Sequence, residues 1–590
     1  MPVETKQCQN CVQAFQIEPE DFLFYEKIHV PPPTWCPECR MVRRMVWRNE
    51  RALYKRNCEL CKKDVISMYP TSVEFPVYCH DCWWSDKWSP FDYAADYNPS
   101  ENFLEQLKKL LFRTPHAALQ SQNAVNSPYV NVTLNIKDSY LVFGGHDNEN
   151  LYYSNQNAWA KDSFEISFCD KVELCYETVQ CDHSSNLFFS GHSSGCSYSS
   201  FLLDCRNCQD CFLCVGLRNK QYCFLNTQYS KEEYTRLVSE LEPGGFKNLM
   251  KAKEEFKKLI LTSLSRFARF RNAINSTGDD LTNVKKLKNC YASREAENCA
   301  HSLFAVDSIK DSYDVTFAGI KAELLYEMHS TPQSSRSYFN YLVWSSNETQ
   351  YSQDCYSSSD LFVCVGLRNK SYCILNKQYT KEEYEKLVPR IIEHMNSMPY
   401  IDKKGRVYKY GEFFPPELSP FSYNETIAQE YFPLTKEETE SKGYRWKDPE
   451  PRNYEITLKT EAIPDHIKDV KESILNEIIG CAHEQKCNEQ CTQAFRIISQ
   501  ELEFYKKMNL PLPRLCPNCR HYQRIKQRNP LKLWQRKCTC AGIQSENGIY
   551  QNSASHRHGT THCPEEFETS YAPERPEIVY CEDCYQSEVV

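Results

Sequence analysis

The chain has 590 residues, which is too long for one hydrophobic core and suggests about four domains. Hydrophobic residues make up 41% of it, as in globular proteins, but no stretch approaches the ~18 consecutive apolar residues of a membrane-spanning helix. No membrane partner is therefore expected. Because the N-terminus lacks the basic start and apolar run of a signal peptide, we expect a cytoplasmic protein.

The formal net charge is -8, but Lys and Arg are concentrated in two windows. Residues 35–63 contain nine Lys/Arg against three Asp/Glu, and residues 506–537 contain ten against none. The remainder of the chain has a net charge of -24. A polyanionic partner would bind at these two basic segments. The alternative is that they form solvated surface, as charged runs usually do.

Residues 1–98 predict an N-terminal double zinc module. Disulfides are typical of small secreted proteins, so the 32 cysteines of this large chain indicate metal ligands or buried thiols. Four CxxC pairs fall in this segment, and two such pairs hold one tetrahedral Zn²⁺. The predicted ligands are Cys8, Cys11, Cys36, Cys39, Cys58, Cys61, Cys79 and Cys82.

A basic helix is expected directly after the second CxxC pair. Arg40, Arg44 and Arg48 are spaced by four residues and share one helix face, and Tyr54 and Arg56 follow. Such a face neutralises phosphates while an aromatic ring stacks on an unpaired base. The alternative is that these arginines hold the zinc module against the acidic remainder of the chain.

An internal duplication occupies the middle of the chain, after a helical connector at 99–125. "CVGLRNKQYC" at 214–223 returns as "CVGLRNKSYC" at 364–373, and 18 of the 24 residues around each copy are identical. Upstream, "NIKDSYLV" matches "SIKDSYDV" at an offset of 173 instead of 150, so the first copy holds 23 extra residues. A solenoid tolerates such a change because a whole coil can be lost while its neighbours restack.

The duplicated segments predict two right-handed parallel β-helices, at about 126–228 and 288–378. Short runs of β-branched and aromatic residues alternate there with Asn, Asp, Ser and Gly, without a helical period. We expect coils of ~18 to 20 residues, with the second β-helix shorter by about one coil. Several cysteines recur at intervals of nine and are expected to form inward ladders. These are Cys196, Cys205, Cys214, Cys223, Cys290, Cys299, Cys355, Cys364 and Cys373.

A metal site at "CRNCQDCFLC" is the alternative to part of this ladder. Its ligands would be Cys205, Cys208, Cys211 and Cys214. The second copy has Ser358 and Leu361 in place of the middle pair, which favours buried thiols.

A helix is expected to cover the end of each β-helix, giving domains at 126–240 and 288–396. Ser230 with Glu233, and Thr380 with Glu383, have the spacing of a capping box. A helical linker at 241–287 and an extended connector at 397–480 complete the middle of the chain. The repeated decapeptide then serves to turn the last coil, or alternatively forms a recognition loop around Arg218 and Arg368.

Residues 481–590 predict a C-terminal double zinc module that repeats the first one at an offset of 480. A second basic face follows its first zinc site. The predicted zinc ligands are Cys487, Cys491, Cys516, Cys519, Cys538, Cys540, Cys581 and Cys584. The predicted nucleic-acid contacts are Arg520, Arg524, Arg528, Trp534 and Arg536. Four zinc ions per chain are therefore expected.

"HRHGTTHC" adds further potential ligands: His556, His558, His562 and Cys563. They would form an extra metal site, or else an exposed turn, because eight better-paired cysteines already account for two closed sites.

The segment "CQNCVQAFQIEPEDFLFYEKIHVPPPTWCPECRMVRR" resembles the treble-clef-like probable zinc-binding domain family. The resemblance covers about 35 residues at each end and implies zinc modules but little about activity. The whole order of modules is similar to an uncharacterised bacterial protein family. The expected fold is mainly β: two tandem parallel β-helix domains flanked by small treble-clef or zinc-ribbon modules, with helical connectors.

The leading functional hypothesis is a non-enzymatic zinc-containing scaffold that binds nucleic acid, with RNA favoured, or a ribonucleoprotein. Its contacts would come from the basic zinc-module helices. An alternative is a protein-interaction solenoid whose β-helix faces bind proteins or imitate a nucleic-acid backbone. A third is a carbohydrate-active β-helix enzyme, with candidate carboxylates at Asp138, Asp162, Asp182 and Asp204.

Overall fold

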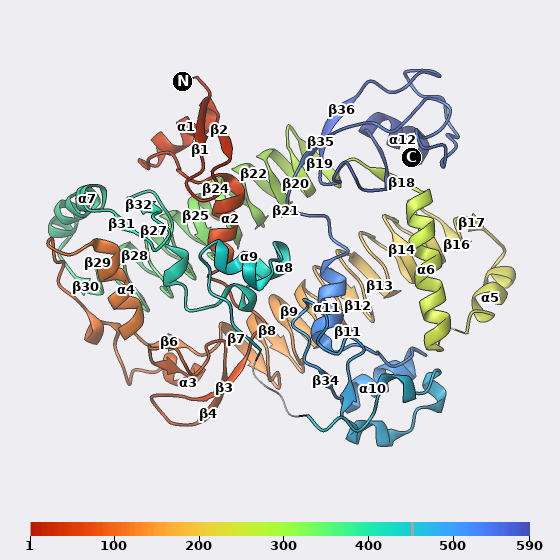
Figure 1. The fold of residues 1–590 in the computed structure, drawn as a ribbon, viewed down its shortest axis with the longest axis horizontal. Helices are drawn as coiled ribbons and strands as arrows, with labels where there is room; N and C mark the ends of the chain where they lie inside the picture. Colours follow the sequence, from red (N-terminus) through yellow and green to blue (C-terminus); the bar gives the residue numbers. More distant parts are fainter. Residues whose placement is uncertain (1, 243, 450–453, 590) are drawn as a thin grey trace. The chain divides into compact units, whose positions relative to one another are not determined.

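The structure is a computed structural model that describes residues 2–242, 244–449 and 454–589 (Figure 1). The chain divides into two compact units. Unit 1 consists of Met1–Leu119, Ala268–Asp448 and Leu531–Leu533, and unit 2 of Gln120–Phe267, Pro449–Pro530 and Trp534–Val590. Each unit therefore combines the cysteine-rich modules of one chain end with half of the duplicated middle. The N-terminal modules belong to the same unit as the second repeat, and the C-terminal modules belong to the same unit as the first repeat.

Unit 2 contains an 11-stranded, mainly parallel sheet. Neighbouring strands pair residues twelve positions apart, as where Thr133 lies beside Gly145. The chain therefore returns alongside itself every twelve residues, and only the last short strand is antiparallel. The strands are β7 (Ser121–Val125), β8 (Asn131–Lys137), β9 (Phe143–Tyr152), β10 (Asn155–Ala158), β11 (Lys161–Phe164), β12 (Asp170–Glu173), β13 (Asp182–Phe188), β14 (Ser197–Leu203), β15 (Gln209–Val215), β16 (Gln221–Phe224) and β17 (Thr227–Gln228).

Unit 1 contains a 12-stranded sheet of the same kind. Its register is also twelve over most of its length, as where Ser335 lies beside Asn347, but Lys310 pairs with Glu323 at a thirteen-residue step. The strands are β19 (Phe270–Ile274), β20 (Gly278–Lys288), β21 (Cys290–Arg294), β22 (Ala296–Ala300), β23 (Leu303–Val306), β24 (Ile309–Gly319), β25 (Glu323–His329), β26 (Ser335–Tyr338), β27 (Asn347–Gln350), β28 (Ser359–Phe362), β29 (Ser371–Ile374) and β30 (Lys377–Gln378).

A three-residue unit underlies both sheets. Every third residue has a positive φ, as in Glu165 and Phe168, and the residue that follows it is buried, as in Ile166 and Cys169. Side chains disfavour this left-handed conformation, which Asn and Asp tolerate best because they hydrogen-bond locally. Many of the positive-φ positions are accordingly Asn, Asp or Gly. Cysteines nine residues apart therefore occupy equivalent inward positions, three units apart.

The inward thiols are bonded to the backbone. Cys205 Sγ donates to the carbonyl of Leu203 at 3.6 Å, and Cys214 Sγ to that of Phe212 at 3.4 Å. Cys208 and Cys211 are also buried in this interior. These contacts are those of small buried side chains, which agrees with the ladder interpretation.

The expected coil length of ~18 to 20 residues is wrong, since the register is twelve. The expected start of the second repeat at 288 is also wrong, because its sheet begins with Phe270 of β19 and is no shorter than the first. In this early part the buried residues Leu281, Val284 and Leu287 recur at intervals of three among exposed lysines. The first copy holds 23 extra residues. Two additional twelve-residue steps in the first copy would add 24 residues, and the thirteen-residue step in the second copy reduces the difference by one.

The predicted covering helices are present and begin at the predicted caps. They are α5 (Lys231–Ser239) and α7 (Lys381–Ser397). Ser230 Oγ accepts a hydrogen bond from the Glu233 amide at 3.2 Å, and Thr380 Oγ1 accepts from the Glu383 amide at 3.2 Å. Both helices pack on the last parallel strand of their own sheet.

The cysteine-rich modules consist of short hairpins, each followed by a helix. In unit 1 they contain β1 (Glu4–Gln7), β2 (Ala14–Ile17), α1 (Pro19–Lys27), α2 (Pro37–Met45), β3 (Tyr54–Asn57), β4 (Asp64–Ser67), β5 (Val77–Tyr78) and α3 (His80–Trp83). In unit 2 they contain β33 (Ile479–Gly480), β34 (Ala494–Phe495), α10 (Ser499–Lys507), α11 (Pro517–Ile525), β35 (Trp534–Lys537), β36 (Glu566–Thr569), β37 (Ile578–Tyr580) and α12 (Glu582–Val589).

The predicted connectors hold the remaining elements. Phe413 and Phe414 of the extended connector are fully buried in unit 1, whereas its residues 450–453 lie outside the described part of the chain. The remaining helices and strands are η1 (Pro90–Tyr93), α4 (Phe103–Arg113), β6 (His116–Ala117), α6 (Phe246–Thr262), β18 (Leu264–Arg266), β31 (Tyr400–Ile401), β32 (Val407–Tyr408), η2 (Pro416–Leu418), η3 (Tyr423–Glu425), α8 (Ile427–Tyr431), α9 (Lys436–Ser441), η4 (Thr460–Ala462), η5 (Ile467–Asp469) and η6 (Glu472–Asn476). Among the described residues, no helix has the length and apolar character needed to cross a membrane.

Candidate metal centres

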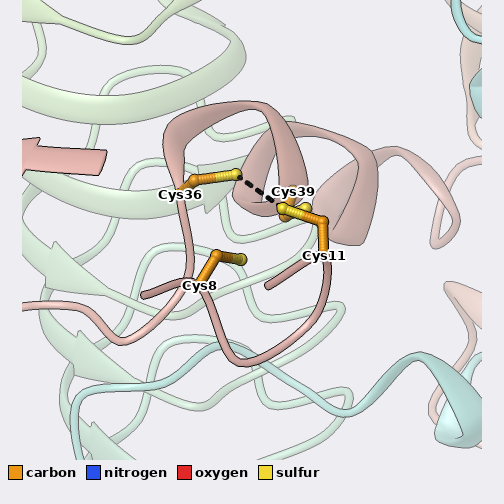
Figure 2. Close-up of side chains that lie close together, drawn as sticks. All are labelled: Cys8, Cys11, Cys36 and Cys39. Atoms are coloured by element: carbon orange, nitrogen blue, oxygen red, sulfur yellow. Dashed lines mark hydrogen bonds between the residues drawn. The ribbon is translucent and has the colours of Figure 1, made fainter. Parts of the chain in front are cut away.

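Four clusters of four cysteines could each hold a metal ion, because their sulfur atoms lie within 4.8 Å of one another. Tetrahedral coordination by four thiolates is typical of structural zinc. Figure 2 shows the side chains of the first cluster pointing toward one another. The clusters are Cys8, Cys11, Cys36 and Cys39; Cys58, Cys61, Cys79 and Cys82; Cys481, Cys491, Cys516 and Cys519; and Cys538, Cys563, Cys581 and Cys584.

The clusters share one local structure. The third cysteine directly precedes a helix and the fourth lies in its first turn, as Cys36 and Cys39 do at α2. The residue after the first cysteine donates its amide to the carbonyl two positions before the third. This bond joins Gln9 to Thr34, Glu59 to Val77, Ala482 to Arg514 and Thr539 to Val579. A helix N-terminus favours thiolates, which are the form that binds zinc.

One thiol in each of the four clusters has a lowered pKa. Thiol hydrogen bonds from Cys36 and Cys39 lower the pKa of Cys8, and those from Cys481 and Cys491 lower the pKa of Cys516. In the second N-terminal cluster, the backbone amide of Lys63 is the main cause that lowers the pKa of Cys61 to about 7. In the fourth cluster, thiol hydrogen bonds from Cys538 and Cys584 lower the pKa of Cys581. Each of these clusters therefore already favours a thiolate.

The predicted ligand Cys487 is replaced by Cys481 in the third cluster. The Cys481 amide donates to the carbonyl of Gln493 at 2.8 Å, as the Cys8 amide does to that of Gln13 at 2.9 Å. Cys481 therefore occupies the first-ligand position, with an insertion before Cys491. Cys487 lies in that insertion, its Sγ 3.7 Å from Cys519 Sγ, and is an additional thiol beside the cluster.

The predicted ligand Cys540 is replaced by Cys563 in the fourth cluster. The Cys538 amide donates to the carbonyl of Glu565 at 3.0 Å, as the Cys58 amide does to that of Lys63 at 2.9 Å. Residues 539–562 are inserted between the two ligands. The pairing of β35 with β36 repeats that of β3 with β4, and it keeps both ends of the insertion together. A comparison of these two hairpins would have identified Cys563.

The basic face of α2 is buried, which contradicts its prediction as a nucleic-acid surface. Arg40 Nη2 lies 2.8 Å from Asp314 Oδ2, and Arg44 Nη1 lies 3.2 Å from Asp314 Oδ1 and 3.0 Å from Glu327 Oε2. Both acids belong to the sheet of unit 1. Arg43, which was not predicted, bonds to Glu327 and lies 2.6 Å from Glu412. The arginines therefore hold the N-terminal cysteine-rich module on the sheet.

The face of α11 is buried in the same way in unit 2. Arg520 pairs with Glu165, and its Nη1 lies 3.3 Å from Glu501 Oε1. Arg524 Nη1 lies 2.6 Å from Glu165 Oε2. Five of the predicted phosphate contacts are thus inaccessible, with exposed fractions of 1% for Arg40, 0% for Arg44, 4% for Arg48, 6% for Arg520 and 2% for Arg524.

Burial and pairing oppose each other in these ion pairs. Burial disfavours the charged form of Asp314, but Arg40 and Arg44 outweigh it and hold the pKa of Asp314 below its usual value. At Glu327 burial prevails over Arg43 and Arg44, and the pKa is raised. Burial likewise raises the pKa of Glu501, although Arg520 lowers it. Removing one partner would leave an uncompensated charge in the core.

The other predicted contact residues also bond within their own units. The Arg48 guanidinium lies 4.1 Å from the Phe317 ring centre, and that of Arg528 lies 4.0 Å from the Phe168 ring centre. Lys447 Nζ lies 3.9 Å from the Tyr54 ring centre. Arg56 donates to the carbonyl of Pro70 at 2.9 Å and Arg536 to that of Ala572 at 3.3 Å, while Trp534 is half-buried in β35. The structure therefore does not gather these residues on one exposed surface.

The repeated decapeptide contacts the second cysteine-rich module of each unit. The Arg368 guanidinium lies 4.9 Å from the Trp83 ring centre and 4.4 Å from that of Trp84. Arg218 Nη2 lies 3.1 Å from Asp204 Oδ2 and 3.3 Å from Tyr585 Oη. Gly216 and Gly366 have φ values of 72° and 77°, as a turn requires. These contacts favour the structural role over a recognition loop.

The candidate carboxylates of the enzyme hypothesis contact side chains of their own unit. Asp138 accepts from Asn126 at 3.1 Å, Asp162 accepts from Asn150 at 2.5 Å, and Asp204 binds Arg218. Asp182 lies 3.6 Å from its neighbour His183. Asn and Asp at turns satisfy local groups, so these contacts support a structural role.

No protein-family model matches the chain, and no curated protein matches it. Among solved structures, one match is the crystal structure of a protein from Desulfovibrio desulfuricans G20 that is provisionally named an acetyltransferase. It covers 49% of this chain and 86% of that chain, with 11% sequence identity and a TM-score of 0.10. A similarity this weak carries no argument about fold or function.

Proposed function

We propose that the protein is a non-enzymatic scaffold, stabilised by zinc, that binds a protein partner on its duplicated middle region. The observation that carries the proposal is the burial of the arginines of α2 and α11 in ion pairs with acids of the sheets. Charge already neutralised inside the protein is unavailable to phosphates. The formal net charge of -8 also disfavours a polyanionic partner.

Each parallel sheet is best explained as one side of a β-helix with a twelve-residue coil. The uniform register supports this, because it returns the chain beside itself in successive strands. The shared arrangement of a knuckle followed by a helix likewise supports treble-clef modules at both ends, each with a structural zinc. Thiolate zinc sites suit the reducing cytoplasm.

The exposed corners of unit 2 are the proposed contact surface. Asn123 donates to Asn135 at 2.9 Å, and Asn135 donates to Asp147 at 2.8 Å, so equivalent polar side chains form a row along the coils. Lys137 lies beside this row and binds Glu149 at 2.9 Å. Side chains that are already fixed by hydrogen bonds lose little conformational entropy when a partner binds. Such a surface therefore suits recognition of a folded protein.

Affinity capture with the full chain, before and after nuclease treatment, tests the proposal. We expect a protein partner that survives nuclease and is lost when Asn135 and Asp147 are both replaced by Arg. Glu254→Arg, on an exposed helix position, is the matched control and should retain the partner. Single-stranded RNA should not bind at about 50 mM salt, where phosphate contacts are strong. Loss of the partner on nuclease treatment, or direct RNA binding, would support the nucleic-acid hypothesis instead.

A further inference from the structure

The insertion in the fourth cluster brings a second set of metal-binding atoms to the same place. Residues 539–562 contribute Cys540, His556 and His558, and their ligand atoms lie within 4.8 Å of one another and of Cys584 Sγ. Cys540 and His556 are buried, and His558 is half-buried. Two thiolates and two imidazoles form a ligand set that is typical of tetrahedral zinc.

The distances within this set fit one ion. Cys540 Sγ lies 3.1 Å from His556 Nδ1, and His558 Nε2 lies 3.2 Å from Cys584 Sγ. With Zn–S bonds of about 2.3 Å and Zn–N bonds of about 2.0 Å, neighbouring ligand atoms in a tetrahedron are separated by about 3.5 Å. Small side-chain adjustments would therefore admit the ion.

Both histidines are held with the required nitrogen directed into the cluster. His556 Nε2 bonds to Glu588 Oε1 at 2.7 Å, which leaves Nδ1 for the metal. Glu588 is itself fixed by the amides of Ser553 at 2.8 Å and Ala554 at 3.1 Å. His558 Nδ1 bonds to the carbonyl of Thr561 at 2.8 Å, which leaves Nε2. Such supporting contacts orient the ligands of established metal sites.

We propose that this module holds two zinc ions that share the Cys584 thiolate. One ion is bound by Cys538, Cys563, Cys581 and Cys584, and the other by Cys540, His556, His558 and Cys584. Four thiolates around one Zn²⁺ leave an excess of negative charge, and Cys540 adds to it in a buried position. A second dication offsets that charge. The inference depends on zinc at the fourth cluster and is independent of the scaffold role.

The chain offers two internal controls. In the corresponding module of unit 1 only two residues separate Cys58 from Cys61, so it lacks such an insertion and should bind one ion. His562 belongs to the same insertion but is exposed, and its Nδ1 lies 3.1 Å from the carbonyl of the adjacent Cys563. Its removal should not change the metal content.

Metal analysis of the full-length protein by mass spectrometry gives the first test. We expect five zinc ions per chain, four from the cysteine clusters and one from the additional site. Cys540→Ser and the double variant His556→Ala with His558→Ala should each lower the count by one. His562→Ala should leave it unchanged. A count of four in the wild type that neither variant lowers would overturn the inference.

Cadmium NMR of the wild type gives a second test that does not depend on the variants folding. After replacement of zinc by ¹¹³Cd, two resonances should show mutual scalar coupling through the shared sulfur, and the other three should not. Five uncoupled resonances would overturn the bridge, because the ions would then occupy separate sites.

Discussion

Units 1 and 2 share one plan, but their buried charges differ. Unit 1 buries Arg40, Arg43 and Arg44 with three acids, two from the sheet and Glu412 from the connector. Unit 2 buries Arg520 and Arg524 with two acids, Glu165 and Glu501. The counterpart of Arg43 is Gln523, which is exposed. The difference indicates that an arginine is retained in the core only where an acid accompanies it, because an unpaired buried charge is costly.

The second cysteine-rich modules of the two units differ in the length of the loop between their first two metal-ligand cysteines. In unit 1 the hairpin of β3 and β4 is closed by a short knuckle between Cys58 and Cys61, whereas in unit 2 the corresponding loop extends over residues 539–562. The hairpin strands fix the first two ligands in both units. The loop between them can therefore lengthen, and in unit 2 it brings further ligands.

Loss of a zinc ligand should have the largest effect and should remain within one unit. Structural zinc contributes about 10 kcal/mol or more to the folding of small modules. We expect Cys36→Ser to release one zinc and to increase hydrogen exchange in β24 and β25, while the sheet of unit 2 keeps its protection. Hydrogen-exchange mass spectrometry with zinc analysis measures both. Cys223→Ser, at a buried thiol of the unit 2 sheet, is the control and should release no zinc.

Neutralising the central acid of unit 2 should give the next largest effect. Glu165 binds both Arg520 and Arg524, so Glu165→Gln leaves Arg524 without its acid and Arg520 with Glu501 alone. We expect a loss of roughly 3–5 kcal/mol, measured by denaturant unfolding of unit 2. Glu149→Gln, in an exposed pair with Lys137, should cost less than about 1 kcal/mol. Equal losses in the two variants would contradict the buried clamp.

The ion pair of Arg43 with Glu412 has no counterpart among the described residues of unit 2, and replacing one of its members should destabilise unit 1 more than replacing both. Arg43→Gln alone should destabilise unit 1 by about 3 kcal/mol, because Glu412 and Glu327 would both stay buried and lose this cation. The double variant Arg43→Gln with Glu412→Gln should recover the part of this loss that comes from Glu412, as a double-mutant cycle would measure. Additive losses would contradict coupling between the two side chains.

Acid should weaken unit 1 more than unit 2 through a buried histidine. Burial is the main cause that lowers the pKa of His301 from 6.5 to about 4. Between these values the unfolded chain binds a proton that the folded chain excludes, so stability falls as the pH falls, by up to about 3 kcal/mol.

His301→Gln should flatten that dependence in unit 1. Loss of zinc in acid affects both proteins, so the informative quantity is the difference between the stability curves of wild type and variant from pH 6.5 to 4. Parallel curves would exclude His301 as the cause.

The sequence alone determined the features that are formed by residues close together in the chain. The CxxC pairs of unit 1 cluster as predicted, because two thiols on a short knuckle necessarily lie together. Ser230 and Thr380 likewise begin the expected helices, since a cap depends on the next three residues. The sequence also shows the duplication itself. The twelve-residue register also has a signal in the sequence, the apolar residues Leu281, Val284 and Leu287 at intervals of three.

Only the tertiary structure decided the ligands across insertions and the role of the arginines. Cys481 and Cys563 complete their clusters because backbone pairing brings distant residues together, whereas sequence spacing favoured Cys487 and Cys540. An arginine stripe has the same sequence whether it faces water or an acid. Its role depended on Glu165, 355 residues from Arg520, and on Asp314, 270 residues from Arg44. Which acid faces a helix follows from the packing of whole modules, and local spacing contains no information about it.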